Sequence, residues 1–362
     1  MTGLTHISAF IKRSALDLGF DRAGIAPVQE FGELDYFPQW IGEQRHGEMR
    51  YLENRTESGE LKRSSIRVAA PWAKSVIVCA LNYNTAQPYS TEFHDSTKGW
   101  ISRYAWGQRD YHEVILPKLR QLENSIQSEV QAEVRFWSYV DTGPVIERVM
   151  AKYAGIGWIA KNTCIINQQL GSWLFLGVIL TSLELQPDLP PPDRCGTCTR
   201  CLDACPTNAF IEAYKLDATR CISYLTIEKR GEIPEELRDK MGRHIFGCDI
   251  CQDVCPWNRE AAVTNAPEFQ PRLGGPECPP HTSLVNPDLE WLATISEEEF
   301  RRTFRGSPVK RAKRTGIRRN AVVAMGDSGD RRFVPLLRTL EQDEDAVVAG
   351  HAAWTRRRLE GR

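Results

Sequence analysis

The chain has 362 residues, of which 41% are hydrophobic and 26% are charged, and its formal net charge is -1. This composition is ordinary for a globular protein, and the length allows two or three domains with cores of their own. No apolar run approaches the roughly 18 residues of a membrane helix, and residues 1–12 carry no export signal. These features exclude a membrane span and predict a cytoplasmic protein, in which eleven cysteines would stay reduced and serve as metal ligands.

The N-terminal half alternates predicted helices and strands. Apolar residues at helical spacing predict a helix over residues 4–20, and the apolar run at 73–83 predicts a buried strand in which Cys79 fills the core. Four further elements follow in chain order: a helix at 110–125, a strand at 134–140, a helix at 144–153 and a strand at 171–183. This alternation indicates an α/β or α+β sandwich.

Two short motifs in this half resemble cofactor sites. Residues 155–160, G-I-G-W-I-A, match a dinucleotide-binding fingerprint, but they follow a predicted helix instead of a strand, so we reject that interpretation. Asp110-Tyr-His112 begins like the D-x-H-x-x-G element that supplies a histidine to cobalt, yet Ile115 replaces its glycine. His112 is therefore predicted to be a helix-surface or core histidine.

Asp141 lies between a predicted strand and a predicted helix, within the sequence V-D-T-G-P of residues 140–144. One interpretation is a helix N-cap, since aspartate accepts backbone N–H bonds there and Pro144 suits an early helical position. The other is a general acid held at the end of a strand. Spacing alone favours the cap and leaves the acid open.

The segment from Cys195 to Pro256 carries eight cysteines in two runs that each end in Cys-Pro, with Cys221 between the runs. The first run has the C-x2-C-x2-C-x3-C-P spacing of 4Fe-4S proteins, in which the fourth cysteine ligates the other cluster. By this rule one cluster is bound by Cys195, Cys198, Cys201 and Cys255, and the other by Cys205, Cys221, Cys248 and Cys251. Zinc and disulfides are the alternatives. The paired Cys-Pro endings and the extra close cysteine in each run favour iron–sulfur clusters.

The C-terminal third combines predicted helices with a strongly basic segment. A Pro- and Gly-rich linker at 267–280 contains Cys278, which lies outside the cluster spacing. Predicted helices follow at 296–304, from residue 310 onward, at 332–341 and at 344–359, and they resemble a HEAT-like unit. Residues 301–320 carry nine Lys or Arg residues and no acid. Because no acid in the segment compensates this charge, nucleic-acid contact is favoured over a merely solvated face.

Together these residues resemble the epoxyqueuosine reductase family, cobalamin-dependent iron–sulfur enzymes that complete queuosine in tRNA. The resemblance covers nearly the whole chain. It rests on residues 73–78 (AKSVIV), 81–83 (LNY), 102–107 (SRYAWG), 110–112 (DYH), 140–144 (VDTGP), 154–162 (AGIGWIAKN), 220–226 (RCISYLT) and 310–320 (KRAKRTGIRRN), with the eight cluster cysteines. The chain departs from the family pattern by one extra residue between Gly107 and Asp110 and by a short C-terminal domain.

The resemblance implies an α+β multidomain fold. Its parts would be a corrinoid-binding α/β sandwich domain at 1–185, a two-cluster ferredoxin-like domain at 186–265, and a linker with a C-terminal α-helical HEAT-like domain at 266–362. Base-off cobalamin would accompany the two 4Fe-4S clusters. The family pattern places Arg63, Ser102, Asp141, Ile165, Leu176 and Ser223 near the corrin. It places Lys229, Lys310, Arg311, Lys313, Arg314, Arg318 and Arg319 against tRNA.

The same resemblance implies reduction of epoxyqueuosine at the tRNA wobble position to queuosine, the last step of queuosine biosynthesis. Co(I) would attack an epoxide carbon or pass electrons to it, and Asp141, which matches the family's proton donor, would protonate the leaving oxygen. The partners would be tRNA carrying epoxyqueuosine and an external flavodoxin- or ferredoxin-like electron donor. The protein would be a monomer and would not bind a membrane. The alternatives are a corrinoid-dependent reductive dehalogenase and a non-catalytic two-cluster electron carrier.

Overall fold

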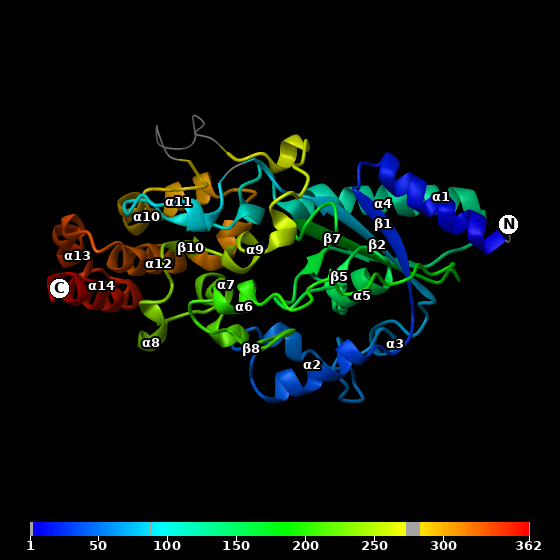
Figure 1. Cartoon of the computed structure of the whole chain (residues 1–362), viewed down its shortest axis with the longest axis horizontal. Coiled ribbons are helices and arrows are strands. Elements are labelled where there is room, and N and C mark those ends of the chain that lie inside the picture. The colour runs from blue at the N-terminus through cyan, green and yellow to red at the C-terminus, as the bar shows by residue number, and fades with distance from the viewer. Residues whose placement is uncertain (1–2, 87, 273–282, 362) are drawn as a thin grey trace.

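A four-stranded antiparallel sheet lies at the centre of the N-terminal half of the computed structural model, which describes residues 3–86, 88–272 and 283–361 (Figure 1). In spatial order its strands are β1 (Arg22–Pro27), β2 (Ser75–Asn82), β7 (Leu174–Thr181) and β4 (Phe136–Tyr139). Strand β2 pairs with β1 and β7, and all its residues are buried. A strand enclosed on both edges and both faces reads as a continuous apolar run, which is why its sequence predicts it so clearly.

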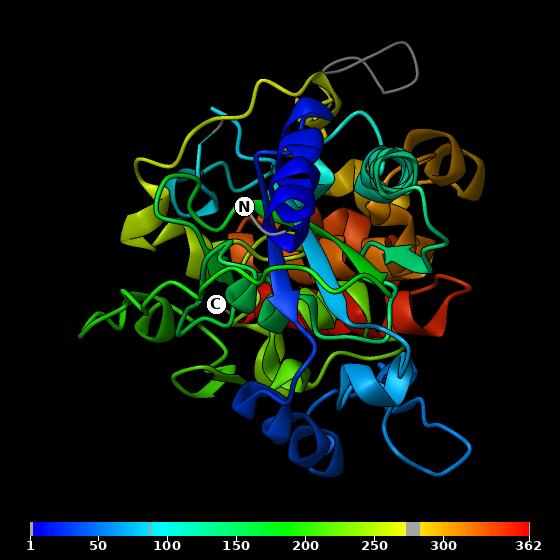
Figure 2. The ribbon, with the colours of Figure 1, turned by 90° about the vertical axis from the view of Figure 1, so that its right-hand side faces the viewer.

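Helices cover both faces of this sheet. Helices α1 (Gly3–Asp17) and α4 (Tyr111–Val130) pack on one face, and α5 (Glu147–Tyr153) packs on the other (Figure 2). Helix α5 approaches β1 so closely that a Cβ atom at Gly24 would lie 1.8 Å from the carbonyl oxygen of Ala154. Only glycine fits at such a contact. The sheet therefore has two apolar faces, each closed by helices.

The structure confirms most of the predicted elements of this half. The predicted strands at 73–83, 134–140 and 171–183 correspond to β2, β4 and β7, and Cys79 is fully buried in the core. Strand β1 was not predicted, because its alternating small residues give little apolar signal. The remaining elements of this half are α2 (Gly32–Gly42), α3 (Ile66–Ala69), β3 (Trp100–Ile101), β5 (Trp158–Ile159) and β6 (Ile165–Ile166).

The cysteine-rich region consists of short elements joined by loops. They are α6 (Arg200–Asp203), β8 (Phe210–Glu212), β9 (Lys215–Leu216), α7 (Ile222–Ile227), α8 (Glu235–Arg238), β10 (His244–Phe246) and α9 (Ile250–Asp253). The two cysteine-bearing helices α6 and α9 contact each other. Strand β10 pairs in parallel with β3, so the region is bonded directly to a segment of the N-terminal half.

Within residues 283–361, which the structure describes, there are five α-helices: α10 (Leu289–Thr294), α11 (Glu297–Thr303), α12 (Lys313–Ser328), α13 (Val334–Leu340) and α14 (Ala346–Glu360). They confirm the helices predicted at 296–304, 332–341 and 344–359, and the hydroxyl of Ser296 caps α11 as its sequence indicates. Helix α12 packs against α10, α14 and β10, and its residues 316–326 are buried. Cys278 lies outside the described residues. In the part of the chain that the structure describes, no helix is long and apolar enough to cross a membrane.

Candidate functional site

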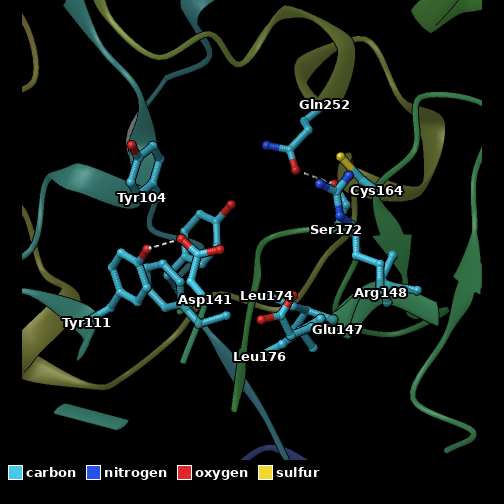
Figure 3. Close-up of a pocket in the computed structure, with 13 residues that line it drawn as sticks. Tyr104, Tyr111, Asp141, Glu147, Arg148, Cys164, Ser172, Leu174, Leu176 and Gln252 are labelled. Carbon is cyan, nitrogen blue, oxygen red and sulfur yellow. Dashed lines mark hydrogen bonds between the residues drawn. The ribbon is translucent and has the colours of Figure 1, made fainter. Parts of the chain in front are cut away.

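A cavity of about 370 Å³ lies where the sheet meets helix α9. Its wall combines aromatic and aliphatic side chains with a few polar groups: Tyr83, Tyr104, Tyr111, Asp141, Glu147, Arg148, Cys164, Ile165, Ser172, Leu174, Phe175, Leu176 and Gln252. Figure 3 shows Asp141 and Tyr111 on one side of this cavity and Cys164 with Gln252 on the other. We call it the acid cavity. It brings together residues from β7, the turn after β4, the start of α4, and α9.

Asp141 occupies a tight turn directly after strand β4. Its φ of 59° places it in the left-handed region, which aspartate tolerates better than most residues. The N–H of Thr142 closes the turn by donating to the carbonyl oxygen of Val140 at 2.7 Å. Helix α5 begins only at Glu147, and its N-cap position is Ile146. The N-cap interpretation of Asp141 is therefore wrong, because the helix starts further along the chain than its sequence indicated.

The Asp141 carboxylate accepts a hydrogen bond of 3.1 Å from the Tyr111 hydroxyl. Burial, and secondly the charge of Asp141, raise the pKa of Tyr111 far above its usual value, so the phenol remains a donor. The ring of Tyr111 stacks on Phe175, with centroids 4.4 Å apart and an angle of 8° between the planes. Tyr111 thus supports the carboxylate from a fixed aromatic platform.

Glu147 is a second acid in the wall of the acid cavity. Its Oε1 atom is buried and has no hydrogen-bond partner among the described residues, and the same holds for the Tyr139 hydroxyl. Burial, and secondly the charge of Asp141, raise the pKa of Glu147 to about 7. The sequence does not predict this site, because a glutamate in the first turn of a helix is an ordinary stabilising residue.

A second cavity of about 620 Å³ shares Asp141, Glu147 and Arg148 with the first. Aromatic and basic side chains line it, including Trp40, Tyr51, Arg63 and Arg311. The Arg311 guanidinium lies over the Tyr51 ring at 5.5 Å from its centroid. We call it the aromatic groove. It joins the acid cavity to the surface that carries the exposed basic residues of 310–313.

The structure distributes the six predicted cobalamin contacts over four places. Asp141, Ile165 and Leu176 line the acid cavity, and Arg63 lines the aromatic groove. Ser102 is buried and its hydroxyl donates to the Asp249 carboxylate. Ser223 lies at the start of α7, next to Cys221. The contacts of Ser102 and Ser223 with a corrin stay predictions.

Four cysteines from both cysteine runs line a cavity of about 260 Å³: Cys195, Cys198, Cys201 and Cys255. Burial, and secondly the mutual repulsion of their charges, raise the pKa values of Cys201 and Cys255 to about 11. Iron offsets such a penalty, because it binds the thiolate form. The donor set therefore suits a metal cluster.

The remaining cysteines form a second group. Burial, and secondly the charge of Cys221, raise the pKa of Cys248, and Cys205 adds to the raised pKa of both Cys221 and Cys248. The fourth thiol, Cys251, interacts with Cys164, which is outside the predicted ligand set and lines the acid cavity. Next to it, the Gln252 side chain accepts a hydrogen bond of 3.0 Å from the Ser172 hydroxyl. Cys164 and Gln252 thus connect this cysteine group with the acid cavity.

The two motifs set aside in the sequence have structural roles. Residues 155–160 follow helix α5 and contain strand β5, so the strand-before, helix-after context of a dinucleotide fingerprint is absent, as its predicted context indicated. His112 lies in the first turn of α4, where Nδ1 is 2.7 Å from the Asp110 carboxylate. Asp110 also caps the helix by accepting the His112 N–H at 3.1 Å.

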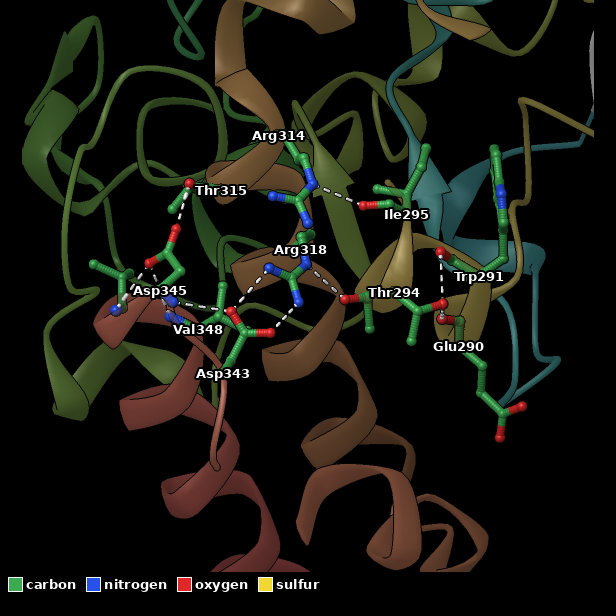
Figure 4. A network of polar contacts seen from close by, with 12 residues as sticks. Glu290, Trp291, Thr294, Ile295, Arg314, Thr315, Arg318, Asp343, Asp345 and Val348 are labelled. Atoms are coloured by element: carbon green, nitrogen blue, oxygen red, sulfur yellow. Dashed lines mark hydrogen bonds and ion pairs between the residues drawn. The ribbon is translucent and has the colours of Figure 1, made fainter. Parts of the chain in front are cut away.

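The prediction that Arg318 and Arg319 contact tRNA is wrong. Their exposed fractions are 4% and 1%, and both guanidinium groups are bound inside the protein. Arg318 forms two bonds with the Asp343 carboxylate and donates to the carbonyl oxygen of Ala293 at 2.9 Å (Figure 4). Charge compensation comes from an acid beyond the basic segment.

Arg319 donates to three main-chain carbonyl oxygens, those of Leu225, Lys229 and Gly231, at 2.7 to 2.9 Å. The next residue, Asn320, donates to the carbonyl oxygens of Thr226 and Ile245. These five bonds attach helix α12 to the cysteine-rich region. The two residues have a structural function that their sequence context did not predict.

The other predicted tRNA contacts lie at or near the surface. Lys310, Arg311 and Lys313 are exposed, and Arg311 forms an ion pair of 2.6 Å with Glu228. Lys229 is partly buried and pairs with Glu48 at 2.5 Å. Arg314 is partly buried and donates to the carbonyl oxygen of Ile295 at 2.8 Å. Lys310 and Lys313 are therefore the most accessible candidates.

Paired cysteine groups beside a cavity that holds an acid define an iron–sulfur oxidoreductase. A family model described as a 4Fe-4S double cluster binding domain matches residues 194–258, and one described as epoxyqueuosine reductase QueG, DUF1730 matches residues 63–142. The epoxyqueuosine reductase of Pseudomonas aeruginosa is 41% identical over 98% of this chain and 94% of its own. That of Xanthomonas campestris is 37% identical over 97% and 95%. The chain belongs to the epoxyqueuosine reductase family.

Solved structures agree with this assignment. A crystal structure of an epoxyqueuosine reductase with an epoxyqueuosine-modified tRNA-Tyr stem loop has a TM-score of 0.84 and 33% identity over 98% of this chain and 90% of that one. The enzyme of Streptococcus thermophilus has a TM-score of 0.82 and 28% identity over 99% and 91%. The assignment favours the epoxyqueuosine reductase interpretation over the dehalogenase and the electron carrier.

Replacing Arg319 with alanine should lower the free energy of unfolding by about 3 kcal/mol or more, because several buried carbonyl groups lose their donor. Urea denaturation of the anaerobically prepared protein measures this change. Arg301, whose side chain is 76% exposed in an ion pair with Glu297, provides the control. Its alanine variant should stay within about 0.5 kcal/mol of the parent protein. Equal stabilities of the two variants would contradict the structural role of Arg319.

Proposed function

We propose that this protein reduces epoxyqueuosine in tRNA to queuosine. The observation that carries the proposal is the acid cavity, in which Asp141 faces Cys164 and Gln252 next to the second cysteine group. The reaction consumes two electrons and two protons, breaks both C–O bonds of the epoxide, and releases its oxygen as water. A cavity with an acid on one side and an electron source on the other supplies both requirements.

Two 4Fe-4S clusters would carry the electrons one at a time from an external flavodoxin- or ferredoxin-like donor. One would be held by Cys195, Cys198, Cys201 and Cys255, and the other by Cys205, Cys221, Cys248 and Cys251. The shared cavity of the first four thiols and the mutual charge effects within the second group support this partition. The second cluster would be the one closer to the acid cavity, because Cys251 interacts with Cys164.

The acid cavity and the aromatic groove fit base-off cobalamin. Phe175, Leu174 and Leu176 offer an apolar surface to a flat macrocycle. The buried polar atoms of Glu147 and Tyr139 lack partners among the described residues, as expected where a polar ligand is missing. Ile165 and Leu176 would contact the corrin and Arg63 its polar periphery. Reduced cobalamin would supply a reductant and a strong nucleophile that attacks carbon.

Asp141 would protonate the oxygen that leaves the substrate. Its carboxylate lies on the turn that follows strand β4, where Tyr111 orients it by a hydrogen bond. A proton donor at this point avoids the expulsion of an unstabilised alkoxide. In the Bacillus subtilis epoxyqueuosine reductase, a catalytic loop that carries an aspartate has been seen swung out of the active site. The turn of Asp141 would open in the same way to admit the substrate.

The domains would divide the work. Residues 1–185 would form the corrinoid-binding α/β sandwich, residues 186–265 the ferredoxin-like domain, and residues 266–362 the linker and the HEAT-like domain. Lys310 and Lys313 would contact the tRNA backbone, and Arg311 would extend this surface into the aromatic groove. The wobble nucleoside would enter through that groove, since aromatic rings and guanidinium groups are good stacking partners for bases.

In the proposed crossed partition, each cluster takes ligands from both cysteine runs. It predicts which pairs of cysteine substitutions lose more iron than either substitution alone. The double variant C201A and C255A should keep about half of the iron, because both residues serve one cluster. The double variant C201A and C205A, although its two positions are only four residues apart, should lose nearly all of the iron. Iron quantitation after anaerobic reconstitution measures both. C164A is the control: its thiol lies beside Cys251, yet it should keep the full iron content. Equal iron in the two double variants would refute the crossed partition.

Replacing Asp141 with asparagine should lower the rate of queuosine formation by about 10²-fold or more, because the amide cannot donate the proton. Nucleoside mass spectrometry of epoxyqueuosine-containing tRNA after anaerobic incubation measures the rate. Cobalamin absorbance and tRNA affinity should stay close to those of the parent protein. The exposed acid Asp17, at the end of α1, provides a control in D17N. Activity of D141N near that of D17N would exclude the assigned role.

Alanine at Lys310 and Lys313 together should weaken tRNA binding and reduce the slope of log K against log salt by about 1.4 to 1.8, as expected for two lost phosphate contacts. Fluorescence anisotropy over a salt series measures the slope. Arg332 and Arg338 lie near helix α13 at the far end of the molecule (Figure 1) and give a matched control. The same slope in both double variants would contradict contact through Lys310 and Lys313.

A further inference from the structure

The acid cavity contains two carboxyl groups, those of Asp141 and Glu147. Asp141 and Glu147 line the same cavity and also the groove that joins it, so both carboxyl groups face the volume in which the substrate would be bound. Asp141 comes from the turn after β4 and Glu147 from the start of α5, and Figure 3 shows both side chains at the cavity. The reduction needs two protons on a single oxygen. One carboxylic acid holds one proton.

The Glu147 carboxyl group interacts with its own main-chain N–H, and its Oε1 atom is available to a ligand. Its Oε1 atom is buried without a hydrogen-bond partner among the described residues, and the neighbouring Tyr139 hydroxyl is in the same situation. A buried polar atom without a partner costs about 1–3 kcal/mol, so such an atom in a cavity wall points to a ligand. Glu33, a glutamate of α2, shows the contrast: its two oxygens bind Lys152 and Tyr153.

We propose that Glu147 is the second acid of the reaction and delivers one of the two protons that convert the epoxide oxygen to water. Asp141 gives the other proton. The first proton accompanies cleavage of one C–O bond and leaves a hydroxyl group on the ring. The second allows that hydroxyl group to depart as water while the second C–O bond breaks. The two electrons come from the external donor through the clusters, so atoms and charge balance. This inference rests on the proposed function.

The charges around Glu147 suit a proton donor at neutral pH. Burial is the main cause that raises its pKa to about 7, and the charge of Asp141 is the second. The main-chain N–H of Glu147, and after it Arg63 and Arg148, oppose the rise in the Glu147 pKa. Tyr139, which lies close enough to feel the charge of Glu147, remains a neutral phenol because burial raises its own pKa. Glu147 is therefore protonated in an appreciable fraction of molecules near pH 7. This fraction falls tenfold per pH unit above that value.

The test compares E147Q with the parent protein in the oxygen-loss assay over a pH series. In the parent protein the rate should decline as pH rises through about 7, because the donor loses its proton. In E147Q the rate should be lower by about 10²-fold at pH 6, and the decline near pH 7 should be absent. Glu113 is an exposed glutamate in the first turn of α4, and its variant E113Q is the control. E113Q should keep the decline in rate near pH 7.

A second measurement does not depend on activity. Infrared difference spectroscopy of the protein without tRNA should show a protonated carboxyl band that titrates near pH 7 and is missing in E147Q. The D141N variant should move this titration to lower pH, because the removal of a neighbouring negative charge makes ionisation easier. A band that persists in E147Q would overturn the assignment.

The outcomes separate this inference from the proposed function. A parent protein that leaves epoxyqueuosine unchanged would overturn the proposed function and the role of Glu147 with it. An active parent protein whose decline near pH 7 survives in E147Q would overturn only the second acid. If E147Q takes up less cobalamin but keeps the decline in rate near pH 7, Glu147 is a cofactor contact. This result would also overturn its role as the second acid.

Discussion

The buried carboxylate of Asp249 holds the two halves of the candidate active site together. It lies between Cys248 and Cys251, is 1% exposed, and accepts hydrogen bonds from the Trp100 indole, the Ser102 hydroxyl and the main-chain N–H of Arg103. A buried charge is stable only when its lone pairs are satisfied. These bonds fix the second cysteine run to the segment that carries Tyr104, a wall residue of the acid cavity. Together with the pairing of β10 with β3 and the bond between Ser172 and Gln252, this group sets the spacing between the cysteines and that cavity.

The fold places the cysteines and the acid on opposite sides of the cavity. Helix α9 carries Gln252 to one side of the cavity, next to Cys164, while the turn after β4 carries Asp141 to the other. Electrons and protons would thus reach the substrate from opposite directions. In the proposed reaction such a separation would favour protonation of the leaving oxygen over protonation of the reduced centre. The α/β part would supply the acid, and the cysteine-rich part would supply the electrons.

The sequence predicts the parts of this protein that follow local rules. Cysteine spacing identifies the cluster region, and apolar runs identify β2 and β7, because ligand geometry and burial act over a few neighbouring residues. Long-range pairing was not predictable. The partner of Arg318 is Asp343, and the partners of Arg319 are main-chain carbonyl groups in the cysteine-rich region. The basic segment therefore overstated the nucleic-acid surface. Glu147 was missed because a glutamate in the first turn of a helix gives no sign of the cavity that its side chain lines.

The central claim is that the epoxide oxygen leaves as water and that both protons go to this oxygen. Anaerobic turnover in D₂O, followed by mass spectrometry of the nucleoside after back-exchange in H₂O, tests it most directly. We expect a product that has lost one oxygen atom and carries no deuterium on carbon. A product that retains the oxygen as an alcohol, or that carries carbon-bound deuterium, would contradict it.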